Sequence, residues 1–222
     1  MPAHFTSDLF QFLSDLEANN NRDWFNANKQ RYESSCRDPM LRFIADFEPK
    51  LREISPHFVA DPRPSGGSMF RIYRDTRFSN DKSPYKTNIA AHFPHVDSGK
   101  VTSTPGYYIT LSPGECYAGA GLWRPDPLAL AKVREAIVTD PESWSGIAGK
   151  LSHGEDTLAR PPRGFDPNHP FIEDIKRKSF VMGVAFADEQ VSAQDFLDTF
   201  AATCRNFTPL MQFLSLAVGI AW

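Results

Sequence analysis

Residues 106–122 read GYYITLSPGECYAGAGL, and they carry a strand–turn–strand pattern. It holds two short runs of β-favouring residues on either side of Ser112, Pro113 and Gly114. A serine, a proline and a glycine between two such runs are typical of a turn. The stretch therefore predicts a β-hairpin.

Further β-favouring runs lie on both sides of this hairpin. Residues 69–74 and 89–94 precede it, and residues 179–187 follow it. In the first of these runs Phe70 and Ile72 alternate with polar side chains, which is the pattern of a half-buried strand with its basic side turned outward. Short strands that follow one another without intervening helices imply an antiparallel sheet.

Helices are predicted before the strands, where apolar residues recur at three- and four-residue steps. Thr6 or Ser7 caps the first helix, and three consecutive asparagines end it. Pro39 fits the first turn of a later helix. Pro49 lies inside the apolar stripe of that helix and predicts a kink or an early stop.

Helices are also predicted after the strands. Asp126 and Pro127 are typical of a helix start, Ser192 begins another helix with an approximate capping box, and Pro209 kinks or restarts it. Residues 152–170 are rich in proline. An irregular segment of this length is more often a binding loop or a lid than an idle connection.

This order of elements predicts the class α+β, with a central, mainly antiparallel sheet flanked by N-terminal, middle and C-terminal helices. We expect a single domain over residues 1–222. It would be helical in residues 1–54 and mainly strands in residues 68–122, with a helix, a long loop, a strand and a C-terminal helix in residues 123–222. The chain is long enough to bury a substantial core, because 41 % of its 222 residues are hydrophobic.

Cysteine content and the chain ends suggest a cellular location. Cys36, Cys116 and Cys204 are far apart and form no CxxC pair, which argues against a disulfide framework or a zinc knuckle. The N-terminus lacks the pattern of an export signal, and the C-terminal apolar run is too short to span a bilayer. We therefore expect a soluble, cytoplasmic protein with no membrane partner. A pI near 6.1 argues against a general nucleic-acid-coating surface.

The densest group of charged side chains lies in residues 70–88, FRIYRDTRFSNDKSPYKTN. Five cations face only two acids there, whereas the whole chain carries a net charge of −3. A local excess of cations in an acidic protein indicates a place where an anion is held. Arginine offers a planar fork for carboxylate or phosphate, and lysine adds compact charge.

We expect residues 71–86 to form a pocket for a small ligand that bears phosphate or carboxylate. In this hypothesis the cations hold the anion, two tyrosines frame it and two acids orient the arginines. The candidate ligand-binding residues are Arg71, Tyr73, Arg74, Asp75, Arg77, Asp81, Lys82, Tyr85 and Lys86.

Two other interpretations of the same charges remain open. The arginines and acids could form a purely structural ion-pair network, with the function elsewhere. Alternatively, they could form an open surface that binds nucleic acid or another protein. The sequence contains no evident nucleophile–base pair, so it leaves enzymatic activity, catalytic residues, cofactors and oligomeric state undecided. His92 and His95 lie on a predicted strand broken by Pro94, and their spacing therefore does not indicate a metal site.

The stretch RIYRDTRFSNDKSPYKTN resembles a family of bacterial and fungal proteins known as domain of unknown function 2461. FLSDLEANNNRDWFNANKQRY near the N-terminus and PRGFDPNHPFIEDIKRKSF later in the chain are similar to the same family, as is GLWRPDPLALAKVREAI between them. The likeness covers nearly the whole length. It implies neither an activity nor any catalytic residue, so the candidate roles above rest on side-chain chemistry alone.

Overall fold

The computed structural model of the chain describes residues 3–77, 80–152 and 157–222. A four-stranded antiparallel sheet lies at its centre, with the strands in their order along the chain. The strands are β1 (Ile89–Pro94), β2 (Gly106–Leu111), β3 (Cys116–Leu122) and β4 (Phe180–Phe186). The predicted hairpin is confirmed as β2 and β3, and the predicted α+β class is confirmed with it.

The N-terminal part of the chain is helical, as predicted. Its elements are α1 (Ser7–Ala18), α2 (Arg22–Ala27), α3 (Lys29–Tyr32), a π-helical turn η1 (Glu33–Arg37) and α4 (Asp38–Ile54). The side chain of Thr6 caps α1 by accepting a hydrogen bond from the backbone N–H of Asp8. Pro39 lies in the first turn of α4, and the helix runs through Pro49 to Ile54. No early stop occurs there, because the buried face of the helix continues to Leu51.

Two groups of helices follow the hairpin, one before β4 and one after it. The middle helices are α5 (Pro127–Thr139), α6 (Pro141–Ser145) and α7 (Ile172–Ile175). The C-terminal helices are α8 (Asp188–Val191), α9 (Phe196–Asn206) and α10 (Thr208–Val218). Asp126 caps α5 as predicted, and Pro209 lies in the first turn of the restarted helix α10. None of the helices that the structure describes has the length and apolarity needed to cross a bilayer.

The predicted helix start at Ser192 is wrong. Ser192 instead ends α8, and α9 begins four residues later at Phe196. Asp195 precedes α9, but its side chain makes no capping hydrogen bond, so the predicted capping box does not form. Of the predicted loop 152–170, residues 153–156 lie outside the described residues. The described part, from residue 157 to residue 170, contains only an isolated bridge, between Thr157 and Arg177.

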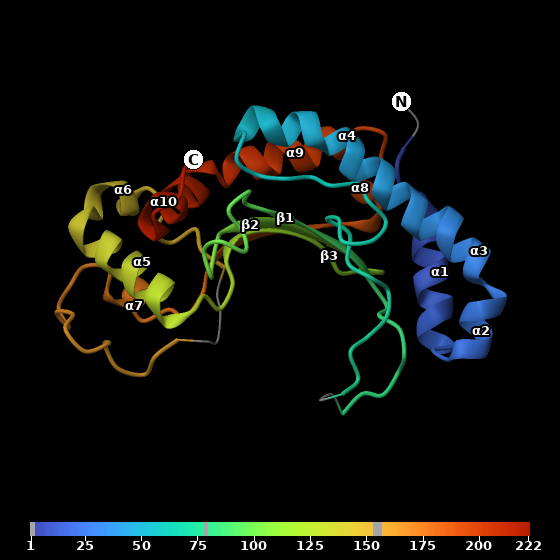
Figure 1. Cartoon of the computed structure of the whole chain (residues 1–222), viewed down its shortest axis with the longest axis horizontal. Helices are drawn as coiled ribbons and strands as arrows, with labels where there is room; N and C mark the ends of the chain where they lie inside the picture. Colours follow the sequence, from blue (N-terminus) through green and yellow to red (C-terminus); the bar gives the residue numbers. More distant parts are fainter. Residues whose placement is uncertain (1–2, 78–79, 153–156) are drawn as a thin grey trace.

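The helices α4 and α9 cover one face of the sheet (Figure 1). Phe47 of α4 packs between Phe93 of β1 and Phe200 of α9, at ring-centroid distances of 4.9 and 4.8 Å. Phe93 pairs with Tyr107 of β2, and both side chains are fully buried on this face. The core that packs against the sheet is therefore rich in phenylalanine and lies on the side of α4 and α9.

The predicted strand at residues 69–74 is wrong. Only isolated bridges occur there, from Met69 to Ala91 of β1 and from Tyr73 to Tyr85. The backbone N–H of Phe70 donates to the carbonyl of Ala90 in β1. After Phe70 the chain leaves β1 and folds back on itself, and the N–H of Arg74 donates to the carbonyl of Pro84. Phe70 was predicted on the buried side but is 44 % exposed, whereas Ile72 is buried as expected.

Candidate functional site

The basic stretch forms a narrow loop whose two arms hold each other. The backbone N–H of Arg74 donates to the carbonyl of Pro84 at 2.9 Å, and the N–H of Lys86 donates to the carbonyl of Ile72 at 2.8 Å. Together with the bridge between Tyr73 and Tyr85, these bonds close residues 72–86 into a loop that extends from the start of β1. We call this segment the basic loop.

The junction between α1 and α2 fixes the basic loop in place. Asn20 Nδ2 donates to the carbonyl of Tyr85 at 3.0 Å, and Asn20 Oδ1 accepts from the N–H of Tyr85 at 3.1 Å. The next residue, Asn21, caps α2 because its Oδ1 accepts from the N–H of Trp24 at 2.9 Å. The cap directs the first turn of α2, and with it Arg22, toward the loop.

Aromatic rings fill the space between α2 and the basic loop. Phe25 and Tyr85 stack with ring centroids 4.0 Å apart and planes 17° from parallel. The ring of Tyr73 lies 5.4 Å from that of Tyr85 but is 54 % exposed. Burial raises the pKa of Tyr85, whereas the charge of Arg22 acts in the opposite direction. Tyr85 is therefore a neutral anchor, and Tyr73 presents its ring to solvent.

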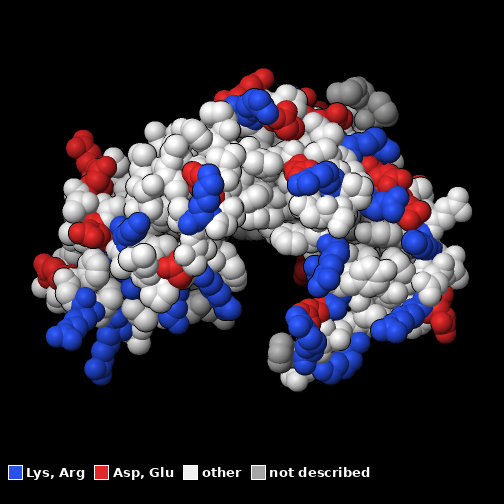
Figure 2. Space-filling view, viewed as in Figure 1, with Lys and Arg blue, Asp and Glu red and all other residues white. Residues whose placement is uncertain are grey.

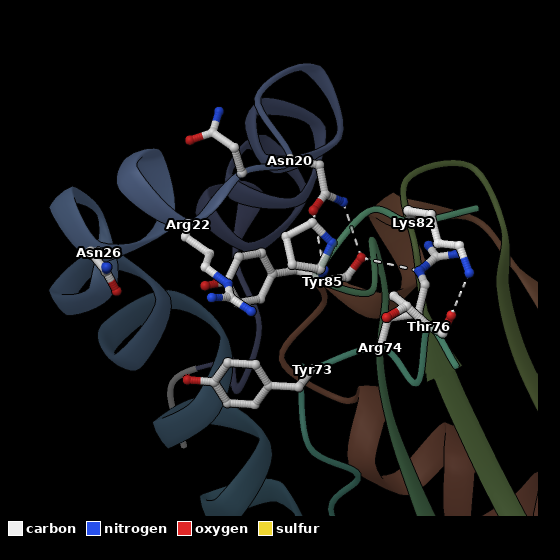
Figure 3. Close-up of a pocket in the computed structure, with 10 residues that line it drawn as sticks. Asn20, Arg22, Asn26, Tyr73, Arg74, Thr76, Lys82 and Tyr85 are labelled. Atoms are coloured by element: carbon white, nitrogen blue, oxygen red, sulfur yellow. Dashed lines mark hydrogen bonds between the residues drawn. The ribbon is translucent and has the colours of Figure 1, made fainter. Parts of the chain in front are cut away.

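A pocket of about 510 Å³ lies between the helix junction and the basic loop. Figure 3 shows the side chain of Arg22 extending from α2 toward Tyr73 and Tyr85. Polar side chains predominate among the lining residues, which are Asn20, Asn21, Arg22, Asn26, Tyr73, Arg74, Thr76, Lys82, Pro84 and Tyr85.

Three cations line the pocket, and they differ in how they are partnered. Arg74 Nη1 lies 2.6 Å from Asp81 Oδ2, and Lys82 Nζ donates to the carbonyl of Thr76 at 2.9 Å. Arg22 makes no ion pair or side-chain hydrogen bond among residues 3–77, 80–152 and 157–222. The pocket therefore combines one cation held by an acid, one held by a backbone carbonyl and one without a counter-charge.

The structure divides the predicted site residues into separate groups. Tyr73, Arg74, Lys82 and Tyr85 line the pocket, and Asp81 supports it by pairing with Arg74. Arg77 pairs with Asp75 at 2.6 Å on the exposed end of the loop, and the hydrogen bond from Arg77 lowers the pKa of Asp75. Neither of these two lines the pocket.

Arg71 and Lys86 form another group. Lys86 Nζ lies 5.3 Å from the centre of the Phe70 ring, in the geometry of a cation–π contact. Burial, together with the charges of Arg71 and Arg74, lowers the pKa of Lys86. These side chains are absent from the pocket lining. The predicted cluster of five cations is therefore not one site.

Several pocket residues were not predicted as part of the site. They are Asn20, Asn21, Arg22, Asn26, Thr76 and Pro84, and the first four come from the helix junction. The run NNNRDWFN carries a signal that could have indicated them, because an asparagine cap followed by an arginine presents polar side chains at a helix start. Only the tertiary contact between Asn20 and Tyr85 brings this run to the basic loop.

The chemistry that the pocket can offer is recognition of negative charge. Its lining, among the residues that the structure describes, includes no cysteine, serine or histidine, and burial raises the pKa of all three thiols, Cys36, Cys116 and Cys204. Among the residues that the structure describes, no group of three or more His, Cys, Asp or Glu side chains could hold a metal ion. The guanidinium, ammonium and amide groups of the pocket are hydrogen-bond donors of the kinds that can bind an anion.

A comparison with protein families gives a clear match. The model of the family described as conserved hypothetical protein (DUF2461) matches residues 8–213. The chain belongs to the DUF2461 family. The resemblance of the central motif is thereby confirmed, and the matched region of this DUF2461 chain includes every residue that lines the pocket. No curated protein matches the sequence.

Proposed function

We propose that this DUF2461 chain binds a small ligand bearing phosphate or carboxylate in the pocket between the α1–α2 junction and the basic loop. The observation that carries the proposal is the unpaired guanidinium of Arg22 in a cavity that Arg74 and Lys82 also line. A cation without a counter-charge beside two others repels them, and an anion in the pocket relieves that repulsion.

The shape of this site supports the binding of a small anion rather than the alternative, in which the same charges form an open binding surface. The volume of about 510 Å³ lies in the range of small-molecule sites. Asp81 orients the fork of Arg74, and the exposed ring of Tyr73 offers an apolar face to the remainder of a ligand. The side-chain amide of Asn26 adds a neutral donor. The proposal covers binding and includes no catalytic step.

Thermal shift with defined anions tests this function. Inorganic phosphate, nucleoside monophosphates, sugar phosphates and dicarboxylates are added to the wild type and to Arg22→Gln. Arg22 makes no ion pair within the described parts of the chain, so its replacement leaves the fold intact. We expect at least one anion to raise the melting temperature of the wild type and Arg22→Gln to lose most of that shift.

A matched control separates the pocket from general charge. Arg52→Gln removes the same charge from α4, where Arg52 pairs with Glu48 and is far from the basic loop in the sequence. It should keep the full ligand-induced shift. The ion-pair alternative predicts a different result, in which Arg74→Ala lowers the melting temperature while no anion in the panel shifts the wild type. That result would rule out the proposed function.

A further inference from the structure

One face of the sheet is covered by none of the helices that the structure describes. The helices α4 and α9 pack on the face that holds Phe93 and Tyr107. Because side chains alternate along a strand, their neighbours His92 and Tyr108 point to the other face. Figure 2 shows a deep hollow below that face, between the N-terminal helices with the basic loop on one side and the α5–α7 region on the other.

Aromatic rings form a row across this open face. Phe70, from the segment that pairs with the edge of β1, lies 6.5 Å from the ring of His92 and 6.2 Å from the ring of Tyr108. His92 and Tyr108 are directly paired residues of β1 and β2. The ring of Phe70 is 44 % exposed. The row thus presents rings to the hollow.

The row continues onto β3 and β4 with a fourth ring. A Cβ atom added at Gly119 or at Gly183 would collide with the ring of Tyr117, so this ring lies flat over both glycines. Gly119 pairs with Tyr108 and with Gly183, which places the ring of Tyr117 in line with the row. The face is therefore a shallow platform of rings that runs across all four strands.

Cations lie beyond both ends of the strands. Lys86 lies over the ring of Phe70, with Arg71 close enough to lower the pKa of Lys86. At the opposite end of the sheet, just beyond β3, Arg124 lies over the ring of Trp123, which is 69 % exposed. Figure 2 shows Lys and Arg side chains on both walls of the hollow. This local positive charge contrasts with the net charge of −3 of the chain.

We propose that the open face of the sheet binds single-stranded nucleic acid, with bases stacked on Phe70, Tyr108 and Tyr117 and the phosphate backbone held by the flanking cations. Aromatic platforms beside positive charge are the general means of binding unpaired bases. A duplex hides the faces of its bases in the stack, so rings on a sheet cannot reach them. The charge of the walls is complementary to a phosphate backbone.

This site is separate from the small-anion pocket. Phe70 contacts β1 and β2, whereas Tyr73 contacts Phe25 of α2. The two aromatic side chains therefore contact different elements, Phe70 the sheet and Tyr73 the helix α2. Because both are exposed, either can be replaced without opening a cavity in the core, and the pair provides matched variants for the two sites.

Fluorescence anisotropy with labelled oligothymidylate and oligouridylate tests the proposal. We expect both single strands to bind the wild type more tightly than a duplex of equal charge. Phe70→Leu should weaken single-strand binding about tenfold or more, since stacking on one ring contributes that much. Tyr73→Leu should leave it unchanged. Lys86→Gln should weaken it and reduce its salt dependence, whereas Arg52→Gln on the exposed side of α4 should do neither.

Each contrary outcome has a distinct meaning. Absence of single-strand binding by the wild type, or a duplex affinity equal to that of the single strand, overturns the proposal. Equal losses in Phe70→Leu and Tyr73→Leu also overturn it, because binding would then not be confined to the open face of the sheet. Arg22→Gln distinguishes the two functions, since it removes the response to small anions and should leave oligonucleotide affinity intact. Circular dichroism of every variant confirms that the fold is retained.

Discussion

The side chain of Asn20 hydrogen bonds with both backbone groups of Tyr85, which lies 65 residues further along the chain. The side-chain amide thereby makes the two backbone hydrogen bonds that a neighbouring β-strand would make with Tyr85. It joins the α1–α2 junction to the loop and sets the distance between Arg22 and Arg74 across the pocket. This polar contact, together with the stack of Phe25 on Tyr85, holds the basic loop against the helices.

Replacement of Asn20 should therefore loosen the pocket. Asn20→Ala removes both hydrogen bonds and leaves the partly buried N–H and carbonyl of Tyr85 without them. We expect the free energy of unfolding to fall by roughly 1–3 kcal/mol. Chemical denaturation measures this loss. Asn19→Ala is the control, because Asn19 makes one exposed bond to the carbonyl of Asp15. Equal stability of the two variants would contradict the role of Asn20.

Arg77 should be dispensable for ligand binding. Its guanidinium is 76 % exposed and paired with Asp75, and it does not line the pocket. Arg77→Gln changes the net charge by the same amount as Arg22→Gln. We expect the thermal shift produced by inorganic phosphate or a nucleoside monophosphate to persist in Arg77→Gln and to decline in Arg22→Gln. Loss of the shift in both variants would show that only the summed charge of the loop matters.

Tyr107 offers a prediction about stability. Its side chain is fully buried, and its hydroxyl has no hydrogen-bond partner among the residues that the structure describes. Burial of a hydroxyl without a partner is unfavourable. Tyr107→Phe keeps the ring contact with Phe58 and should raise the free energy of unfolding by about 1 kcal/mol. A lower stability in denaturant titrations would mean that the hydroxyl is satisfied in solution.

His95 should make stability depend on pH. Burial lowers the pKa of His95, against the opposing effects of the Ala221 carbonyl and the Asp97 carboxylate, and His57 lowers it further. The neutral ring accepts from the N–H of Asp97 through Nδ1 and donates through Nε2 to the carbonyl of Ala221.

A lowered pKa in the folded state means that the unfolded chain takes up the proton first as the pH falls. The free energy of unfolding should therefore decrease below about pH 6.5, where an unperturbed histidine begins to charge. His95→Gln should show a shallower decrease over the same interval in denaturant titrations at several pH values. Some slope should remain, because burial also lowers the pKa of His92. Equal slopes in the two proteins would contradict this assignment.

Local patterns in the sequence predicted most elements of the fold. The turn at Ser112–Gly114 and the caps at Thr6 and Asp126 act over a few residues, so they can be recognised without knowledge of the fold. Residues 69–74 could not be placed in this way. Their composition is that of a strand, but Phe70 bonds to β1 while Arg74 bonds to Pro84, and only the tertiary structure determines that exchange of partners.

The candidate site was only partly predictable for a related reason. Charge counting found the basic loop, but it could not determine that Arg77 turns to Asp75 and that Lys86 turns to Phe70. Arg22 was missed because its own surroundings in the sequence carry no excess of charge. It reaches the pocket through the contact of Asn20 with Tyr85, which joins segments that are distant along the chain.

The ring of Tyr117 places an evolutionary constraint on β4. Any side chain at position 183 would meet the phenol oxygen and ring carbons of Tyr117, and a side chain at position 119 would meet the same ring. In homologues that carry a large aromatic residue at position 117, positions 119 and 183 should remain glycine. Where position 117 holds a small residue, both positions become free to vary, so the three should change together during divergence.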